Sequence, residues 1–380
     1  MSSGSGNSLA YNLGGITIAL VTALLLYILL SSHEPEQPEG RTVSHETIAP
    51  PSTNPASEAK WTKHSVPLPA GYRVQLARPS GRDSCVLGYD DAGKIYVGVV
   101  FPSLATKDYV VGASAPDEYV AADAAVVNGK AYVLFRVGTY YPDREPDVDW
   151  LAYRSKRFQP RDGWEPETPS IVSTWNEKKA EWERVDGLPK LIGRIYGNGS
   201  KDLILSCFDD EMYLLTFYEY SPGKAIREMY QATEAVVSIT GETDYPPEGI
   251  YSFSGNKALF TACVGEDFES CEREWHRWLG ILTPESNWGM STPLSSSWSS
   301  DRRETYALAL PERNYVYVDG GICEYSDNFL LLRRFRLPET MRAYTEQQHV
   351  TVMPIYGGLL AYETRSRRLN VLLNPELVEE

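Results

Sequence analysis

Short apolar runs of strand length recur through residues 61–380, and this recurrence most constrains what the chain can fold into. Each run is rich in Val, Ile, Tyr and Phe and ends at Gly, Asn, Asp or Pro. Many short strands at spacings of about ten residues are typical of a β-sandwich or a β-propeller. The runs are residues 94–101, 130–141, 202–208, 211–220, 257–264, 314–322, 329–337 and 350–362.

A weak repeat favours the propeller. A tryptophan opens a short extended segment that Leu-Pro or Pro-Leu closes, as in the outer strand of a propeller blade. The three copies begin at Lys60-Trp61, at Glu181-Trp182 and, less clearly, at Asn287-Trp288. Residues 173–189, STWNEKKAEWERVDGLP, resemble the last hairpin of a kelch-type blade but lack the paired glycines of that family. The resemblance implies an architecture and does not assign a family.

We therefore predict an all-β propeller of about six blades, with five or seven left open. The strand at residues 61–69 is expected to complete the last blade and close the ring, which removes an exposed edge. Asn128-Gly129 and Ser254-Gly255-Asn256 are predicted hairpin turns. The predicted blades are residues 70–115, 116–190, 191–233, 234–296, 297–343 and 344–378, and the second is long enough to hold an insertion.

Two segments favour helix over strand. Asp117 to Val127 is rich in alanine, and Phe268, Cys271, Trp275 and Trp278 or Leu279 fall at helical spacing. Short helices are expected at both places.

Residues 13–30 form an uncharged apolar run, LGGITIALVTALLLYILL. As a helix it would span about 27 Å, close to the hydrocarbon thickness of a thin bilayer. The preceding residues 1–12 contain no Lys or Arg, which disfavours a cleaved signal peptide. A buried helix is the remaining alternative. We predict a single-pass signal anchor, with the short tail inside the cell and the large domain outside the cytosol.

Residues 31–60 are rich in Pro, Ser and Thr and contain no aromatic residue, so they predict a disordered stalk between the anchor and the propeller at 61–380.

The formal net charge of the chain is −15 at pH 7. A surface of this sign repels phosphate backbones, so nucleic acid is not expected as a partner.

The five cysteines show no zinc-binding spacing. Cys263 and Cys271 are close enough in sequence to form a disulfide in an oxidising compartment, whereas Cys207 lies in an apolar run that favours a buried free thiol. Asn198-Gly199-Ser200 matches the acceptor motif for N-glycosylation.

Catalytic motifs are absent from the sequence. It contains five histidines, of which only His276 and His349 lie well inside the predicted propeller, and no GxSxG, HExxH or phosphate-loop pattern. Catalytic residues therefore stay unknown, and the chain is expected not to be an enzyme. Glycosidases on propeller folds use carboxylates from separate blades, so a glycoside hydrolase-like activity stays open.

The insertion of the second blade combines acids with aromatic residues. Four acids alternate there, as a calcium site would require, although a solvated acidic loop has the same pattern. Calcium is the only cofactor that the pattern suggests. Aromatic rings beside carboxylates suit a sugar, although such rings also pack between blades. The acids are Asp143, Glu145, Asp147 and Asp149, and the predicted ligand-binding residues are Tyr140, Tyr141, Trp150 and Trp164.

We predict a membrane-anchored propeller, held at the cell surface or in a secretory lumen through residues 13–30, that binds a glycan or protein ligand. A carbohydrate-active enzyme on the same fold is the first alternative. A structural subunit of a membrane assembly is the second.

Overall fold

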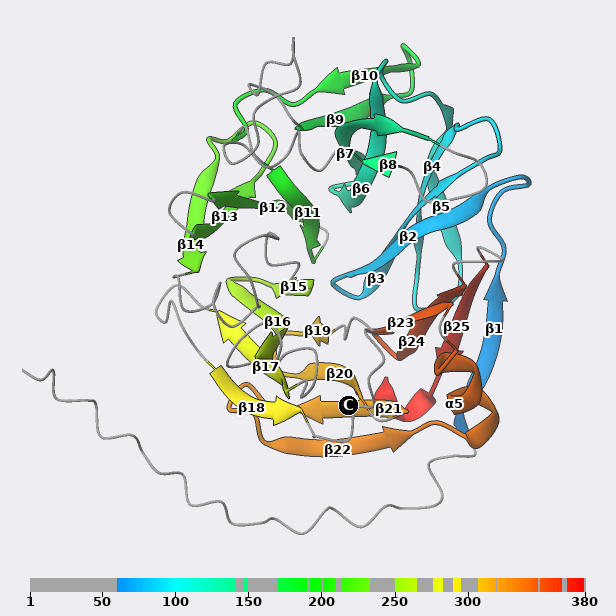
Figure 1. The fold of residues 1–380 in the computed structure, drawn as a ribbon, viewed down its shortest axis with the longest axis vertical. Coiled ribbons are helices and arrows are strands. Elements are labelled where there is room, and N and C mark those ends of the chain that lie inside the picture. The colour runs from blue at the N-terminus through cyan, green and yellow to red at the C-terminus, as the bar shows by residue number, and fades with distance from the viewer. Residues whose placement is uncertain are drawn as a thin grey trace, which may run out of the picture. The chain divides into compact units, whose positions relative to one another are not determined.

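Six antiparallel sheets follow one another around a ring (Figure 1), as the sequence predicts for a six-bladed propeller. Apart from the closing strand expected at residues 61–69, the strands of each sheet fall within one predicted blade. The computed structural model describes residues 60–140, 147–148, 170–189, 192–199, 201–209, 214–232, 250–264, 276–282, 290–294, 307–318, 320–347, 349–363 and 368–378.

Within each of blades 1 to 5 the strands run in sequence order from the ring centre outward. Blade 2 carries the additional two-residue strand β8 (Asp147–Val148), which pairs with β7. Blade 1 contains β2 (Arg73–Ser80), β3 (Asp83–Tyr89), β4 (Ile95–Val100) and β5 (Thr106–Ala113). Blade 2 contains β6 (Tyr119–Val127), β7 (Lys130–Thr139), β9 (Ser170–Asn176) and β10 (Glu181–Arg184). Blade 3 contains β11 (Ile192–Asn198), β12 (Asp202–Asp209), β13 (Leu214–Tyr220) and β14 (Arg227–Ala232).

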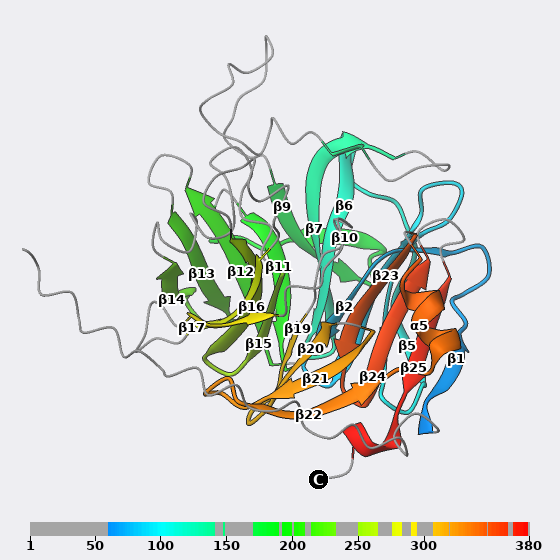
Figure 2. The same ribbon diagram turned by 60° about the horizontal axis from the view of Figure 1, so that its bottom comes forward.

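The remaining three blades repeat this plan, with short helical segments beside the last (Figure 2). Blade 4 contains β15 (Ile250–Ser254), β16 (Lys257–Val264), β17 (His276–Leu282) and β18 (Met290–Leu294). Blade 5 contains β19 (Ala307–Ala309), β20 (Asn314–Val318), β21 (Gly321–Tyr325) and β22 (Leu331–Arg336). Blade 6 contains β23 (Val350–Ile355), β24 (Gly358–Glu363), β25 (Leu369–Leu373) and β1 (Thr62–Val66), and α5 (Glu339–Thr345) and the 3-10 helix η2 (Pro375–Leu377) complete the described elements.

The ring is closed by the first strand of the described chain. β1 pairs antiparallel with β25, in a register that runs from Thr62 opposite Leu373 to Val66 opposite Leu369. Trp61, just before β1, is buried in the apolar layer between blades 5 and 6. The predicted closing strand is therefore confirmed, and its tryptophan fastens it to the core.

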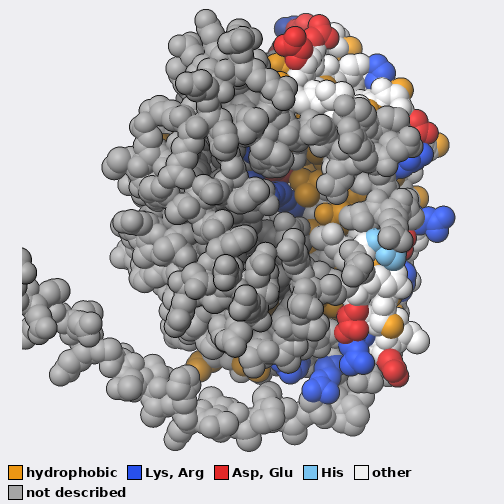
Figure 3. All heavy atoms as spheres, in the orientation of Figure 1, with side chains coloured by type: hydrophobic (Ala, Val, Ile, Leu, Met, Phe, Trp, Pro, Cys, Tyr) orange, Lys and Arg blue, Asp and Glu red, His pale blue; other side chains and the backbone are white. Residues whose placement is uncertain are grey.

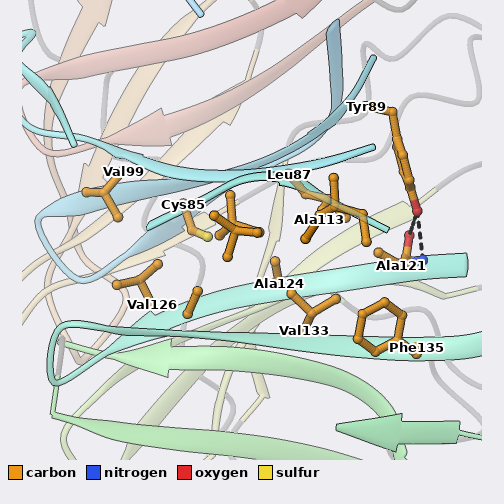
Figure 4. Close-up of a cluster of buried hydrophobic side chains, with 14 residues drawn as sticks. Cys85, Leu87, Tyr89, Val99, Ala113, Ala121, Ala124, Val126, Val133 and Phe135 are labelled. Atoms are coloured by element: carbon orange, nitrogen blue, oxygen red, sulfur yellow. Dashed lines mark hydrogen bonds between the residues drawn. The ribbon is translucent and has the colours of Figure 1, made fainter. Parts of the chain in front are cut away.

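Apolar layers between neighbouring blades hold the ring together. Between blades 1 and 2, one face of β3 and β4 packs on one face of β6 and β7 (Figure 4). The hydroxyl of Tyr89 donates to the carbonyl of Ala121 at 2.9 Å and accepts from the same residue's N–H at 2.7 Å. Burial raises the pKa of Tyr89, because its phenolate would lose hydration. Comparable layers join blades 2 and 3, 4 and 5, 5 and 6, and 6 and 1.

Both predicted hairpin turns are confirmed. Asn128 and Gly129 link β6 to β7 with φ values of 50° and 72°, the left-handed conformation that a tight two-residue hairpin requires. Gly255, with φ of 60°, begins the turn between β15 and β16. The segment at 173–189 also forms the last hairpin of its blade, β9 with β10.

The predicted helix at Asp117 to Val127 is wrong. Residues 119–127 form β6, and three of its alanines are buried, Ala121 and Ala124 against blade 1 and Ala125 against blade 3. Small side chains fit where two blades converge toward the ring centre, so packing overrides the helical propensity of alanine. Trp278 and Leu279 likewise lie in strand β17, which contradicts that end of the second predicted helix, while Phe268, Cys271 and Trp275 lie outside the described residues.

The predicted anchor at residues 13–30 and the stalk at 31–60 lie outside the described residues, apart from Lys60. In the part of the chain that the structure describes, no helix has the length and apolar character needed to cross a bilayer.

Candidate functional site

The predicted ligand-binding insertion is described only at its edges. Tyr140 is placed, and Asp147 is placed as a backbone position in β8, opposite Thr139 of β7. The other predicted residues lie outside the described ranges, and they are Tyr141, Asp143, Glu145, Asp149, Trp150 and Trp164. The aromatic and calcium-binding roles of the insertion therefore stay predictions.

Tyr140 fixes the start of the insertion to blade 1. Its ring stacks on Tyr89 with centroids 4.7 Å apart and an interplanar angle of 27°. Its hydroxyl donates to the carbonyl of Asp90 at 2.7 Å, in the turn between β3 and β4. The turn residue Gly93 lies so close to the Tyr140 ring that a Cβ atom there would be 2.9 Å from it. The half-buried ring of Tyr140 thus packs between two blades, and it holds the end of β7 beside the turn at 90–94.

The end of the ring opposite this insertion is closed by the inner hairpins. A Cβ atom on Gly81, in the β2–β3 turn, would lie 2.8 Å from Cα of Gly199 in the β11–β12 turn. The amide nitrogen of Asn128 donates to the carbonyl of Lys201 at 2.6 Å. Figure 1 shows the β2–β3 hairpin extending into the centre of the ring. These contacts join blade 1 to blade 3 and blade 2 to blade 3, and we call this set of touching turns the floor of the ring.

Asn198, the predicted glycosylation site, belongs to this floor. Its side-chain nitrogen donates to the carbonyl of Gly255 at 2.9 Å, and its side-chain oxygen accepts from the N–H of the same residue at 2.9 Å. The residue is buried and ties blade 3 to blade 4. Glycosylation would require its amide nitrogen to leave this bond, so the geometry favours a structural role for Asn198.

A buried ion pair joins three blades above the floor. Nη1 of Arg78, on β2, donates to Oδ2 of Asp123, on β6, at 2.9 Å. The same carboxylate oxygen accepts from the backbone N–H of Ile195, on β11, at 3.1 Å, and Oδ1 accepts from the N–H of Ala124 at 2.9 Å. The Arg78 guanidinium also lies 5.7 Å from the ring centroid of Tyr196. Asp123 therefore connects the inner strands of blades 1, 2 and 3.

Further polar groups lie beside this pair. Nη2 of Arg136, a buried residue of β7, donates to the carbonyl of Gly193 on β11. Nε of Arg78 and Oγ of Ser80 are buried without a hydrogen-bond partner among the described residues. Figure 3 shows Lys and Arg side chains inside a hollow at the centre of one face of the ring. Buried polar groups of this kind are normally satisfied by water.

Carboxylates in the described interior are paired with arginines. Asp123 is held by Arg78, and the buried Glu324 on β21 accepts from Nε of Arg333 at 2.6 Å and lies 3.5 Å from Arg313. Within the described ranges, no three His, Cys, Asp or Glu side chains are near enough to one another to hold a metal ion. The described carboxylates thus serve to join strands and blades.

Within the described residues, the thiols of Cys85, Cys207 and Cys323 form no disulfide. Burial raises the pKa of the Cys85 and Cys207 thiols to about 12, because a thiolate would be desolvated there. Both side chains are therefore poor nucleophiles at neutral pH, and the predicted free thiol at Cys207 is confirmed. The proposed partner of Cys263, Cys271, lies outside the described residues, so that disulfide stays a prediction.

Arg78, Asp123 and Arg136 were not among the residues singled out in the sequence. A charged residue within an otherwise apolar strand is the signal that marks Asp123, which stands between alanines in AADAAVV. Because the ion pair joins separate blades, only the arrangement of the ring identifies its partner.

Comparison with known proteins adds likeness of fold only. No family model matches the sequence, and no curated protein matches it. Among solved structures, the β-propeller domain of the Trilobed protease from Pyrococcus furiosus is similar at 10% identity and a TM-score of 0.36, over 77% of this chain and 79% of that one.

Two further structures are similar to the same extent. The Nup133 β-propeller domain from Vanderwaltozyma polyspora has 10% identity and a TM-score of 0.36, over 82% of this chain and 99% of that chain. The calcium-binding protein regucalcin from Agrobacterium tumefaciens has 10% identity and a TM-score of 0.35, over 80% and 93%. At these scores the likenesses carry no functional argument, and the six-bladed assignment rests on the sheet topology.

Proposed function

We propose that this protein is a membrane-anchored propeller outside the cytosol that binds a glycan or protein ligand. The proposed binding face is the end of the ring that carries the blade 2 insertion. The observation that carries the proposal is the difference between the two ends of the ring. Inner hairpins close one end through Gly81, Gly199, Asn128 and Lys201, whereas the insertion follows Tyr140 at the other.

The polar interior supports a binding role for that face. Arg78, Asp123 and the backbone of Ile195 form a buried set of charged and polar groups that fixes the inner strands of blades 1, 2 and 3, so the proposed binding loop stands on a rigid scaffold. Propellers commonly place specificity in loops that surround a rigid scaffold. The insertion, with its five tryptophan and tyrosine residues and its alternating acids, is suited to be such a loop.

Ligand binding is tested by replacing Trp150 and Trp164 together with alanine. We expect the double variant to lose binding on a glycan array or in a pull-down, because stacking surfaces for a ligand are removed. Replacing the exposed Lys201 on the closed end with alanine is the matched control and should leave binding unchanged. Unchanged binding by the tryptophan variant, together with a lower melting temperature, would assign both residues to packing.

A calcium contribution is separable in the same assay. Chelation should weaken binding by the unmodified chain and have no further effect on a variant carrying Asp147→Asn and Asp149→Asn. If chelation weakens ligand binding equally in both proteins, the chelator does not act through a metal ion held by Asp147 and Asp149.

Membrane topology is tested by adding protease to sealed cells. If residues 13–30 span the membrane with residues 1–12 inside, protease should remove the propeller and leave a small membrane-bound fragment. A propeller that is protected until the cells are lysed would refute the proposed orientation. The same fragment should be absent when residues 13–30 are deleted, which provides the control.

A further inference from the structure

The outer edge of blade 5 exposes three consecutive leucines. Leu330, Leu331 and Leu332 are 58%, 37% and 47% exposed, and they lead into and begin β22. Natural edge strands usually carry charges or prolines that discourage pairing with other chains. The outer strand β10 of blade 2 follows that rule with the sequence EWER. A run of exposed leucines on an edge strand therefore indicates an interaction site for another chain.

Among the strands that the structure describes, none pairs with the outer edge of β22. β22 is the last strand of its sheet, with β21 on its inner side. The N–H of Leu337 donates to the carbonyl of Gly320 at 3.0 Å, and the register continues with Arg336 opposite Gly321 and Phe335 opposite Ile322. Because hydrogen-bonded pairs alternate along an antiparallel ladder, the N–H and C=O groups of Arg334 and Arg336 point away from β21.

Charge divides this edge into two halves. The first half is apolar, whereas the second contains Arg333, Arg334 and Arg336 in a chain whose net charge is −15. Arg333 is bonded to Glu324 and Arg334 to the sulfur of Cys323, while Arg336 is exposed beside the outward backbone groups. A complementary strand would therefore combine apolar residues at one end with acidic residues at the other.

We propose that β22 binds an extended segment of another protein as an additional strand, and that this segment carries Val, Ile or Leu residues against Leu330 to Leu332 and Asp or Glu residues against Arg336. Backbone hydrogen bonds supply affinity and the two halves of the edge supply specificity. A second copy of this chain fits less well. Antiparallel pairing of two β22 strands over their whole length would set Arg336 against Leu331 and Arg333 against Arg334 of the other copy.

The experiment uses a phage library of random nonapeptides selected against the purified full chain, with counter-selection against the Leu332→Lys variant. We expect enriched peptides to combine an apolar run with Asp or Glu. Their affinity should fall at least tenfold in Leu332→Lys and in Arg336→Pro, which removes an outward N–H. Arg336→Gln should cause a smaller loss of affinity. High salt should weaken peptide binding by the unmodified chain and thereby remove the difference in affinity between it and Arg336→Gln.

Two controls decide the outcome. Val111→Lys changes a 52% exposed residue on the outer strand β5 of blade 1 and should bind the peptides normally. The Trp150 and Trp164 variant should also bind them, so that failure of the ligand proposal and failure of this one are distinguishable. No enrichment over the Leu332→Lys variant, or self-association of the full chain that Leu332→Lys abolishes, would overturn the proposal.

Discussion

Replacing Asp123 with alanine is expected to lower the free energy of unfolding by about 3–5 kcal/mol. The side chain is 2% exposed and accepts hydrogen bonds from Arg78, Ile195 and Ala124. Its loss leaves a buried guanidinium without its carboxylate and a buried N–H without its acceptor, and each of these is costly. Urea unfolding followed by tryptophan fluorescence measures the change.

A double variant separates the charge from the shape of the site. Arg78→Met with Asp123→Leu removes both charges and fills similar space, and paired buried charges can often be replaced in this way with little loss. We therefore expect the double variant to be more stable than Asp123→Ala alone. If both variants unfold at the same urea concentration as the unmodified chain, the ion pair does not hold blades 1, 2 and 3 together.

The periodicity of the sequence was sufficient to predict the ring. Six sheets occupy the six predicted segments, because each blade is built from consecutive strands joined by local turns such as Asn128-Gly129. The tryptophans at positions 61 and 182 also mark outer strands, since each is a large apolar residue beside an otherwise polar edge. These features are local and can therefore be read along the chain.

Contacts between blades were not predictable in the same way. The alanines of β6 were assigned to a helix because their number fits helical propensity, whereas their small size serves the convergence of two blades. Tyr140 looked like a ligand contact, and its described contacts are with Tyr89 and Asp90 of the neighbouring blade. Arg78 and Asp123 are separated by 45 residues, so nothing in the local pattern joins them.

The exposed edge of blade 5 is an intermediate case. The letters LLLRRFR are visible in the sequence, and they were assigned correctly to a strand. Whether those leucines are buried depends on the position of the strand in its sheet. The topology places β22 at the edge, and that placement converts an ordinary apolar run into a candidate binding surface.

Deleting residues 61–66 is expected to destabilise the propeller more than any single substitution in the ring. The deletion removes β1 and leaves β25 as an exposed edge. It also removes Trp61, which is 5% exposed and belongs to the same buried apolar cluster as Leu310 and Leu372, and loss of a buried tryptophan costs about 3–5 kcal/mol by itself. Thermal unfolding should show a large drop in melting temperature, accompanied by aggregation through the exposed strand.

Two companion variants identify the cause of that loss. Deleting residues 31–55 shortens the chain before β1 and should leave the melting temperature unchanged. This variant is the control for the effect of a shorter chain. Trp61→Ala keeps the hydrogen-bonded pairing of β1 with β25 but removes the buried indole ring. Its melting temperature should therefore lie between those of the two deletions. Equal melting temperatures for the 61–66 deletion and the intact chain would mean that five blades and an open sixth are stable without closure. The ring would then be held by the apolar layers between blades, and β1 would serve only to connect the propeller to the preceding residues.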